Sequence, residues 1–186
     1  GGRGRQPLTE KVTVPPAGYI WDLCAARAIS YRSYGEYVYA TGPDAPPEAL
    51  ASSDGATSLK GHASAAWQAA RAASKRDYEK ADAFIAELRE FERNNTLPRF
   101  MIMSLGENHT QGTRPGAFTP KAAVASNDLA LGKIVEACTQ SRYWKEMAIF
   151  VIEDDAQNGP DHVDAHRTVG FVISPYTKRG FVDSTL

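Results

Sequence analysis

Five carboxylates and two histidines stand within one stretch of sixteen residues, VIEDDAQNGPDHVDAH, from Val151 to His166. No lysine or arginine lies among them, although Lys and Arg nearly balance Asp and Glu over the whole chain, 21 against 22. The cluster is therefore a local feature. Carboxylates packed this densely repel one another unless water, hydrogen-bond donors or a cation neutralises them.

Asp154 and Asp155 follow an apolar stretch, and where a strand ends the backbone can turn so that both carboxylates converge on one ion. Carboxylate pairs suit hard cations, and imidazole shifts the preference towards zinc, manganese or iron. His162 and His166 would share one face of a helix, but the preceding Gly159 and Pro160 indicate a turn. HVDAH also lacks the glutamate of the zinc-protease pattern, so we reject a zinc-protease interpretation of this motif. A turn-capping role for the two aspartates is the alternative.

A third imidazole, His109, lies in the glycine-flanked stretch GENHTQG after a different apolar run. By itself it is typical of a hydrogen-bonded loop histidine. Both polar motifs follow the carboxyl ends of predicted strands, the edge where open parallel sheets bind ligands. Their joint placement favours metal binding. We expect the fourth histidine, His62, to lie in solvent.

The surrounding pattern alternates amphipathic helices with buried strands, which predicts an α/β domain with a mainly parallel sheet and helices on both faces. A segment rich in Pro, Gly and Ser, residues 42–64, predicts a loop or lid inserted in a single domain, residues 1–186. Helical spacing predicts helices within residues 15–30, over 75–94 and from Pro120, where Thr119 is the expected N-cap. Apolar runs predict strands within residues 31–40, 99–105, 147–153 and 169–176.

Bulk composition gives no indication of a nucleic-acid-binding or membrane-spanning protein. A net charge of -1 gives no reason to expect nucleic acid or an anionic membrane as partner. No run approaches the roughly 18 apolar residues of a membrane span. The start of the chain, GGRGRQ, has no hydrophobic signal core. We expect Cys24 and Cys138, which lie in separate helical patterns, to be buried as small hydrophobic residues.

Taken together, these motifs resemble the phosphoesterase branch of the alkaline phosphatase superfamily, which includes phosphatidylcholine-type phospholipases C and certain acid phosphatases. The resemblance covers well over half of the chain and implies metal-dependent hydrolysis of phosphate esters at the carboxyl edge of an alkaline-phosphatase-like α/β sheet. It rests on the stretches GYIWDLCAARAISYRSYGEYV, LPRFMIMSLGENHTQGTRPGAFTPKAAVASNDLALGKIVEA and YWKEMAIFVIEDDAQNGPDHVDAHRTVGFVISPYTKRGFVDSTL.

The resemblance implies a ligand set for a divalent cation, either zinc, manganese, iron or calcium. The paired acids at a strand end look like Asp154 and Asp155, the later His-Thr motif looks like His166 in HRT, and the earlier Asp-His motif looks like GENHT. This chain departs from that motif, because Asn108 stands where relatives have an aspartate. A neutral amide still offers an oxygen ligand, although one negative charge is lost. The remaining similar pair, expected to contact substrate or to support the ligands, is Asp161 and His162.

The nucleophile of this superfamily, a Ser or Thr at a helix amino terminus, has no counterpart here, because nothing before Gly18 supplies the required strand and helix. We therefore expect an incomplete fold, the carboxyl-terminal part of a phosphoesterase, and assign no catalytic residue. Relatives are often exported, which weakly favours an extracytoplasmic location. An incomplete sheet would leave exposed edges and apolar surface, so we expect a homo-oligomer or poor solubility of the isolated chain.

Two other functions stay open. The lost charge at Asn108 and the missing nucleophile favour a non-catalytic module that binds a metal or an anion. A phosphoglycerate-mutase-like activity would need a sugar-phosphate clamp of arginines, and those near the motifs are Arg114, Arg142 and Arg167.

Overall fold

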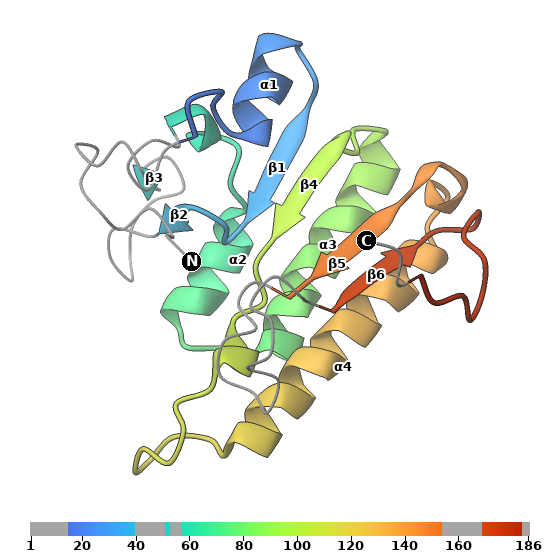
Figure 1. Cartoon of the computed structure of the whole chain (residues 1–186). Helices are drawn as coiled ribbons and strands as arrows, with labels where there is room; N and C mark the ends of the chain where they lie inside the picture. The colour runs from blue at the N-terminus through green and yellow to red at the C-terminus, as the bar shows by residue number, and fades with distance from the viewer. Residues whose placement is uncertain (1–14, 40–50, 53–56, 154–168, 184–186) are drawn as a thin grey trace. The chain divides into compact units, whose positions relative to one another are not determined.

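The structure is a computed structural model of the 186-residue chain (Figure 1). It describes residues 15–39, 51–52, 57–153 and 169–183. The chain forms two compact units, and the division falls between Ala137 and Cys138, in the last turn of α4 (Pro120–Thr139). The larger unit falls within residues 2–137 and the smaller within residues 138–186, and each is treated by itself.

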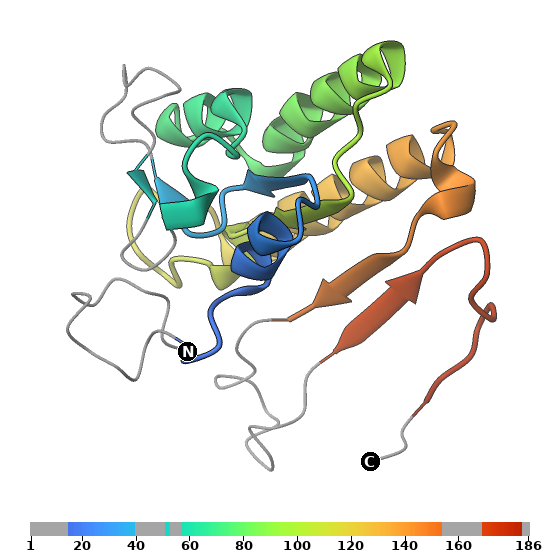
Figure 2. The ribbon, with the colours of Figure 1, turned by 90° about the horizontal axis from the view of Figure 1, so that it is seen from above.

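A parallel pair of strands lies at the centre of the larger unit. β1 (Tyr31–Tyr34) pairs with β4 (Phe100–Met103), with Tyr31 opposite Phe100 and Tyr34 opposite Met103. Helices lie on both sides of this pair: α2 and α3 on one side and α1 on the other (Figure 2). The prediction of an α/β arrangement is confirmed for this unit.

The spacing of Ile20, Leu23 and Cys24 predicts one apolar face for the first helix, and the structure buries only part of that face. α1 (Ile20–Ala26) buries Trp21 and Cys24, while Ile20 and Leu23 are about half exposed. The reason is aromatic packing, because the Trp21 ring stacks on Tyr19 with centroids 4.7 Å apart. The larger aromatic surface therefore decides which face turns inward. These side chains form one core cluster with Tyr31, Val38, Leu59 and Ala63.

Part of the predicted loop, residues 57–64, packs against β1. Leu59 in η2 (Thr57–Leu59) is buried, and the backbone amide of Ser33 donates to the carbonyl of His62 at 2.8 Å. The prediction that His62 lies in solvent is wrong, because its ring is half-buried and stacks on Tyr31 with centroids 4.0 Å apart. A short antiparallel pair, β2 (Val38–Tyr39) with β3 (Ala51–Ser52), flanks residues 40–50, which lie outside the described residues.

A helix that sequence analysis did not predict, α2 (Ala65–Ala72), begins where the expected loop ends. Ser64 is its N-cap and accepts a hydrogen bond from the amide of Trp67 at 3.2 Å. The segment is short and rich in alanine, and Trp67 is its one large apolar residue. Its burial comes from Trp67 and Gln68.

The two long helices form as predicted. α3 (Asp77–Asn94) buries Ala81, Phe84 and Leu88, and it ends at Asn95, whose φ of 56° is left-handed. α4 (Pro120–Thr139) begins at Pro120, and Thr119 accepts a hydrogen bond from the amide of Ala122. Both cysteines are buried, as expected. Within the described residues, no helix is long and apolar enough to span a membrane.

The smaller unit contains η4 (Trp144–Glu146) and an antiparallel pair of strands. β5 (Ile149–Ile152) pairs with β6 (Gly170–Ile173), with Ile152 opposite Gly170. The prediction of a mainly parallel sheet is wrong for this pair. The physical reason is that an antiparallel pair needs no crossover connection, whereas a parallel pair needs one that is usually helical.

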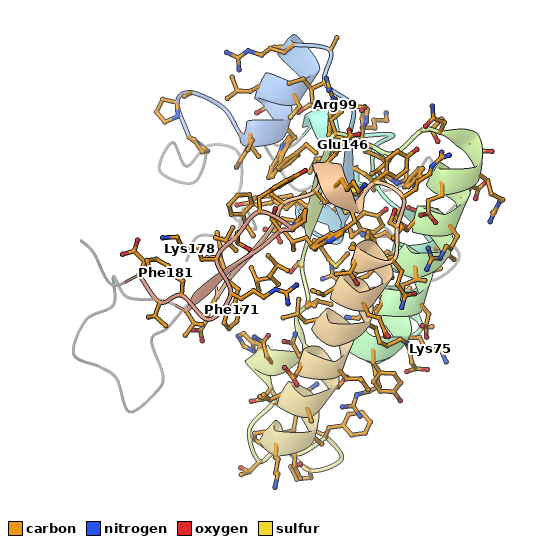
Figure 3. The ribbon with its side chains drawn as sticks, turned by 90° about the vertical axis from the view of Figure 1, so that its right-hand side faces the viewer. Lys75, Arg99, Glu146, Phe171, Lys178 and Phe181 are labelled. Carbon is orange, nitrogen blue, oxygen red and sulfur yellow. The ribbon has the colours of Figure 1, made fainter. Side chains whose placement is uncertain are left out.

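Side chains of β6 and of the segment that follows it are largely exposed. Figure 3 labels Phe171, Lys178 and Phe181, and the ammonium of Lys178 lies 5.1 Å from the centroid of the Phe181 ring. The hydroxyl of Tyr176 donates to the carbonyl of Lys145 at 2.7 Å and so ties this segment to η4.

Candidate functional site

Asn108 and His109 lie on a short turn after β4, as the sequence predicted. The strand ends at Met103, and the turn is η3 (Glu107–His109). Both side chains are exposed, and Nδ1 of His109 lies 3.3 Å from the carbonyl oxygen of Thr110. Because a carbonyl only accepts, this contact favours the tautomer with the proton on Nδ1. It leaves the lone pair of Nε2 open to solvent, which is the form of imidazole that binds a metal.

The backbone of this turn is strained at its end. Thr110 has φ 55° and ψ 175°, close to a region that almost only glycine occupies. A β-branched residue in such a conformation is uncommon and persists only where its surroundings fix it. The side chain of Thr110 accepts a hydrogen bond from the amide of Gly112 at 3.2 Å.

The residue before Asn108, Glu107, ties the turn to the start of α3. The backbone amide of Asp77 donates to Oε2 of Glu107 at 2.8 Å, and the amide of Glu107 donates to Oδ2 of Asp77 at 2.9 Å. Each residue therefore holds the other by backbone and side chain together. The Glu107 carboxylate also forms an ion pair with Arg76. This places negative charge at a helix amino terminus, where the helix dipole favours it.

The same network reaches α4. The hydroxyl of Ser126 donates to Oε2 of Glu107, and the side-chain amide of Asn127 donates to Oδ2 of Asp77 at 3.0 Å. Asp77 is fully buried, and its other oxygen, Oδ1, forms an ion pair with Lys80 without hydrogen-bond geometry. Two helices and the turn therefore share one carboxylate network, which we call the Asp77–Glu107 lock.

A second buried network centres on Glu87 of α3. Its carboxylate accepts two hydrogen bonds from Arg32, at 2.7 and 3.2 Å, one from the hydroxyl of Tyr34 at 2.9 Å and one from Ser64 at 2.8 Å. Burial, and then the charge of Glu87, raise the pKa of Tyr34 well above its ordinary value. Burial alone would lower the pKa of Arg32, but the hydrogen bond and charge of Glu87 outweigh it and raise that pKa. This network holds β1 against α3.

The other predicted site residues lie in residues 154–168, outside the described residues. The structure describes the two ends of that segment, where the amide of Glu153 donates to the carbonyl of Val169 at 3.2 Å. The chain therefore leaves the β5–β6 ladder and returns to it at the same point. The residues concerned are Asp154, Asp155, Asp161, His162 and His166.

Within the part of the chain that is described, no three His, Cys, Asp or Glu side chains gather as they would around a metal ion. Of the predicted ligands, this part contributes the imidazole of His109 and the amide oxygen of Asn108. One nitrogen and one neutral oxygen suit zinc, manganese or iron, so the chemistry of these two donors fits a divalent cation. Two ligands do not hold such an ion on their own.

Comparison with known proteins adds no relative. No protein-family model, no curated protein and no solved structure matches the chain.

Sequence reasoning missed the residues that support the turn. Glu107 stands directly beside Asn108 in GENHT, and Asp77 stands at the start of the clearest predicted helix. Acids at the first turn of a helix are a known signal, but that signal indicates capping and not a partner 30 residues away. Only the fold brings the two acids together.

Proposed function

We propose that this chain carries part of the metal site of a phosphoesterase of the alkaline phosphatase superfamily, which hydrolyses phosphate esters. The observation that supports it best is His109: an exposed imidazole with Nε2 open, on a turn at the carboxyl end of a parallel strand. Asn108 offers an exposed amide oxygen on the same turn.

In this proposal, His109 and Asn108 hold the divalent cation together with Asp154, Asp155 and His166, and the fold is alkaline-phosphatase-like. A cation bound there polarises a phosphoryl oxygen and stabilises the charge that develops on it. The protein's own contribution is to hold the ligands and to keep the proton of His109 on Nδ1. Asp161 and His162 contact the phosphate ester or support the ligands.

A specific observation favours a second function, a non-catalytic module that binds a metal. The exposed donor beside His109 is the neutral amide of Asn108, and it brings no negative charge to the cation. Fewer charges lower the affinity of the site and leave more positive charge on a bound ion, without supplying a nucleophile.

Elemental mass spectrometry of the purified chain, after loading with Zn²⁺ or Mn²⁺ and removal of excess, tests the metal site. We expect near-stoichiometric metal in the wild type, and its loss in His109→Ala and His166→Ala. His62→Gln is the matched control, because His62 packs on Tyr31 and belongs to no predicted ligand set. A wild type that retains no metal contradicts both functions.

Hydrolysis of p-nitrophenyl phosphate and bis(p-nitrophenyl) phosphate by the loaded chain separates the two functions. Metal-dependent turnover that disappears in His109→Ala and persists in His62→Gln supports the phosphoesterase. Bound metal with no turnover of either ester supports the binding module.

A further inference from the structure

Within this proposed function, we infer that Glu107 and Asp77 are positioning residues, which fix the Asn108–His109 turn in the conformation that binds the cation. Neither is a ligand in this inference. They act through the backbone of η3, and the inference rests on the Asp77–Glu107 lock.

The lock fixes the residue that precedes both donors. The amide of Glu107 donates to Asp77 at 2.9 Å, and its carboxylate accepts from the amide of Asp77 at 2.8 Å. Backbone and side chain of Glu107 are thus both held by the same partner. Since Asn108 and His109 follow directly along the chain, the starting direction of the turn is set at Glu107.

The lock is also anchored on two long helices. Asp77 is the first residue of α3, and Ser126 and Asn127 lie in the second turn of α4. Arg76 adds a further tie, because its guanidinium pairs with Glu107 and donates to the carbonyl of Ala122 at 2.8 Å. In Figure 1 the turn after β4 lies beside the amino-terminal parts of α3 and α4. The turn therefore rests on rigid elements, which hold ligands more accurately than a free loop does.

The contrast between Glu107 and its neighbours is what points to positioning. The side chain of Glu107 is only 19% exposed and satisfied by donors, whereas those of Asn108 and His109 are exposed. The strained backbone of Thr110 closes the turn on its other side. A turn that is fixed at its base, strained at its end and exposed at its polar donors has the layout of a preorganised ligand site.

Two measurements on the same variants test the inference: the dissociation constant for Zn²⁺ by calorimetry, and hydrogen exchange of the peptide that covers residues 107–112. In Glu107→Ala we expect exchange in this peptide to accelerate and Zn²⁺ affinity to fall about 10–100-fold, the effect typical of residues that support metal ligands. Glu79→Gln is the matched control. Glu79 accepts from the backbone amide of Arg76 at the same helix end and pairs with Lys75, and among the described residues no hydrogen bond or ion pair joins it to η3. We expect unchanged Zn²⁺ affinity there.

The outcomes separate this inference from the proposed function. Faster exchange together with weaker binding supports positioning. Faster exchange with unchanged affinity, or unchanged exchange, overturns it and leaves the metal site standing. A wild type that does not bind Zn²⁺ overturns the proposed function and the positioning role with it. Should Glu107→Ala fail to fold in a urea titration, the same criteria apply to Glu107→Gln, which keeps the shape and one acceptor oxygen.

Discussion

Replacing Glu87 by alanine should destabilise the larger unit more than any exposed substitution on α3. The carboxylate of Glu87 accepts four hydrogen bonds from three side chains of two other segments, Arg32 and Tyr34 on β1 and Ser64 at the start of α2. Alanine removes all four acceptor contacts and leaves the donors in place. The donors then lie in a part of the core where water cannot fully replace the carboxylate.

The magnitude follows from what each donor loses. The hydroxyl of Tyr34 is fully buried, and an unsatisfied buried polar group costs about 1–3 kcal/mol. Removing one partner of a buried ion pair costs about 3–5 kcal/mol, but the side chain of Arg32 is 24% exposed and recovers part of this from water. Because these costs overlap, we expect a total of about 3–5 kcal/mol. Small domains are stable by only about 5–15 kcal/mol.

Equilibrium unfolding in urea measures this loss. Fluorescence follows the buried Trp67, whose ring lies 5.7 Å from that of Tyr34, and far-UV circular dichroism follows the helices. Glu90→Ala is the control, an exposed position on the same helix, where a change within about 0.5 kcal/mol is expected. A loss of stability below about 1 kcal/mol for Glu87→Ala would refute the reasoning, because water would then replace the hydrogen bonds of the Glu87 carboxylate at almost no cost.

Three further predictions concern the same unit. The folded-state pKa of Tyr34 is raised, so the stability that Tyr34 contributes is complete below the unfolded-state pKa near 10 and is lost as the pH rises towards the folded-state value. Tyr34→Phe should therefore flatten the alkaline fall in stability, by an amount that approaches about 1.4 kcal/mol per pH unit only above pH 10, measured by urea unfolding between pH 9 and 11. Both polar atoms of Gln68 are buried with no hydrogen-bond partner among the described residues, so Gln68→Met should raise stability by about 1 kcal/mol in the same assay, and a decrease would show that the amide has a partner in solution. At Gly35, φ is 92° and an added Cβ would lie 2.8 Å from Nε1 of Trp67, whereas at Gly61 φ is 81° and no atom lies within 4 Å of an added Cβ. Gly35→Ala should therefore lower the melting temperature more than Gly61→Ala does. Equal decreases in melting temperature would contradict the steric argument.

Local pattern was enough to predict the long elements of the fold. The apolar stripe of α3, Ala81, Phe84 and Leu88, is buried, and the Thr119–Pro120 pair begins α4 as its residue types require. These signals work because period and capping are properties of a few neighbouring residues. α2 was not predicted because it is only eight residues long and contains one large apolar side chain, Trp67, which packs against Tyr34 on β1.

The sequence alone did not predict which distant segments pair, or in which direction their strands run. An apolar run predicts that β5 and β6 are strands, but the direction of pairing depends on the path of the chain between them. The same holds for the two carboxylate networks. Glu87 meets Arg32, 55 residues away, and Glu107 meets Asp77, 30 residues away. Each acid on its own is indistinguishable from a solvated surface residue.

The three donors that Glu107 already accepts from make it a poor site for a cation. A carboxylate has room for about four donors, and Glu107 accepts from Asp77, Ser126 and Arg76, the last of which also neutralises its charge. A cation at Glu107 would have to displace the contacts that hold the turn, so the acid nearest to His109 in sequence is a poor ligand. In the Zn²⁺ titrations, Glu107→Gln should therefore retain more affinity than His109→Ala. The reverse order would identify Glu107 as a ligand and would require the lock to open on binding.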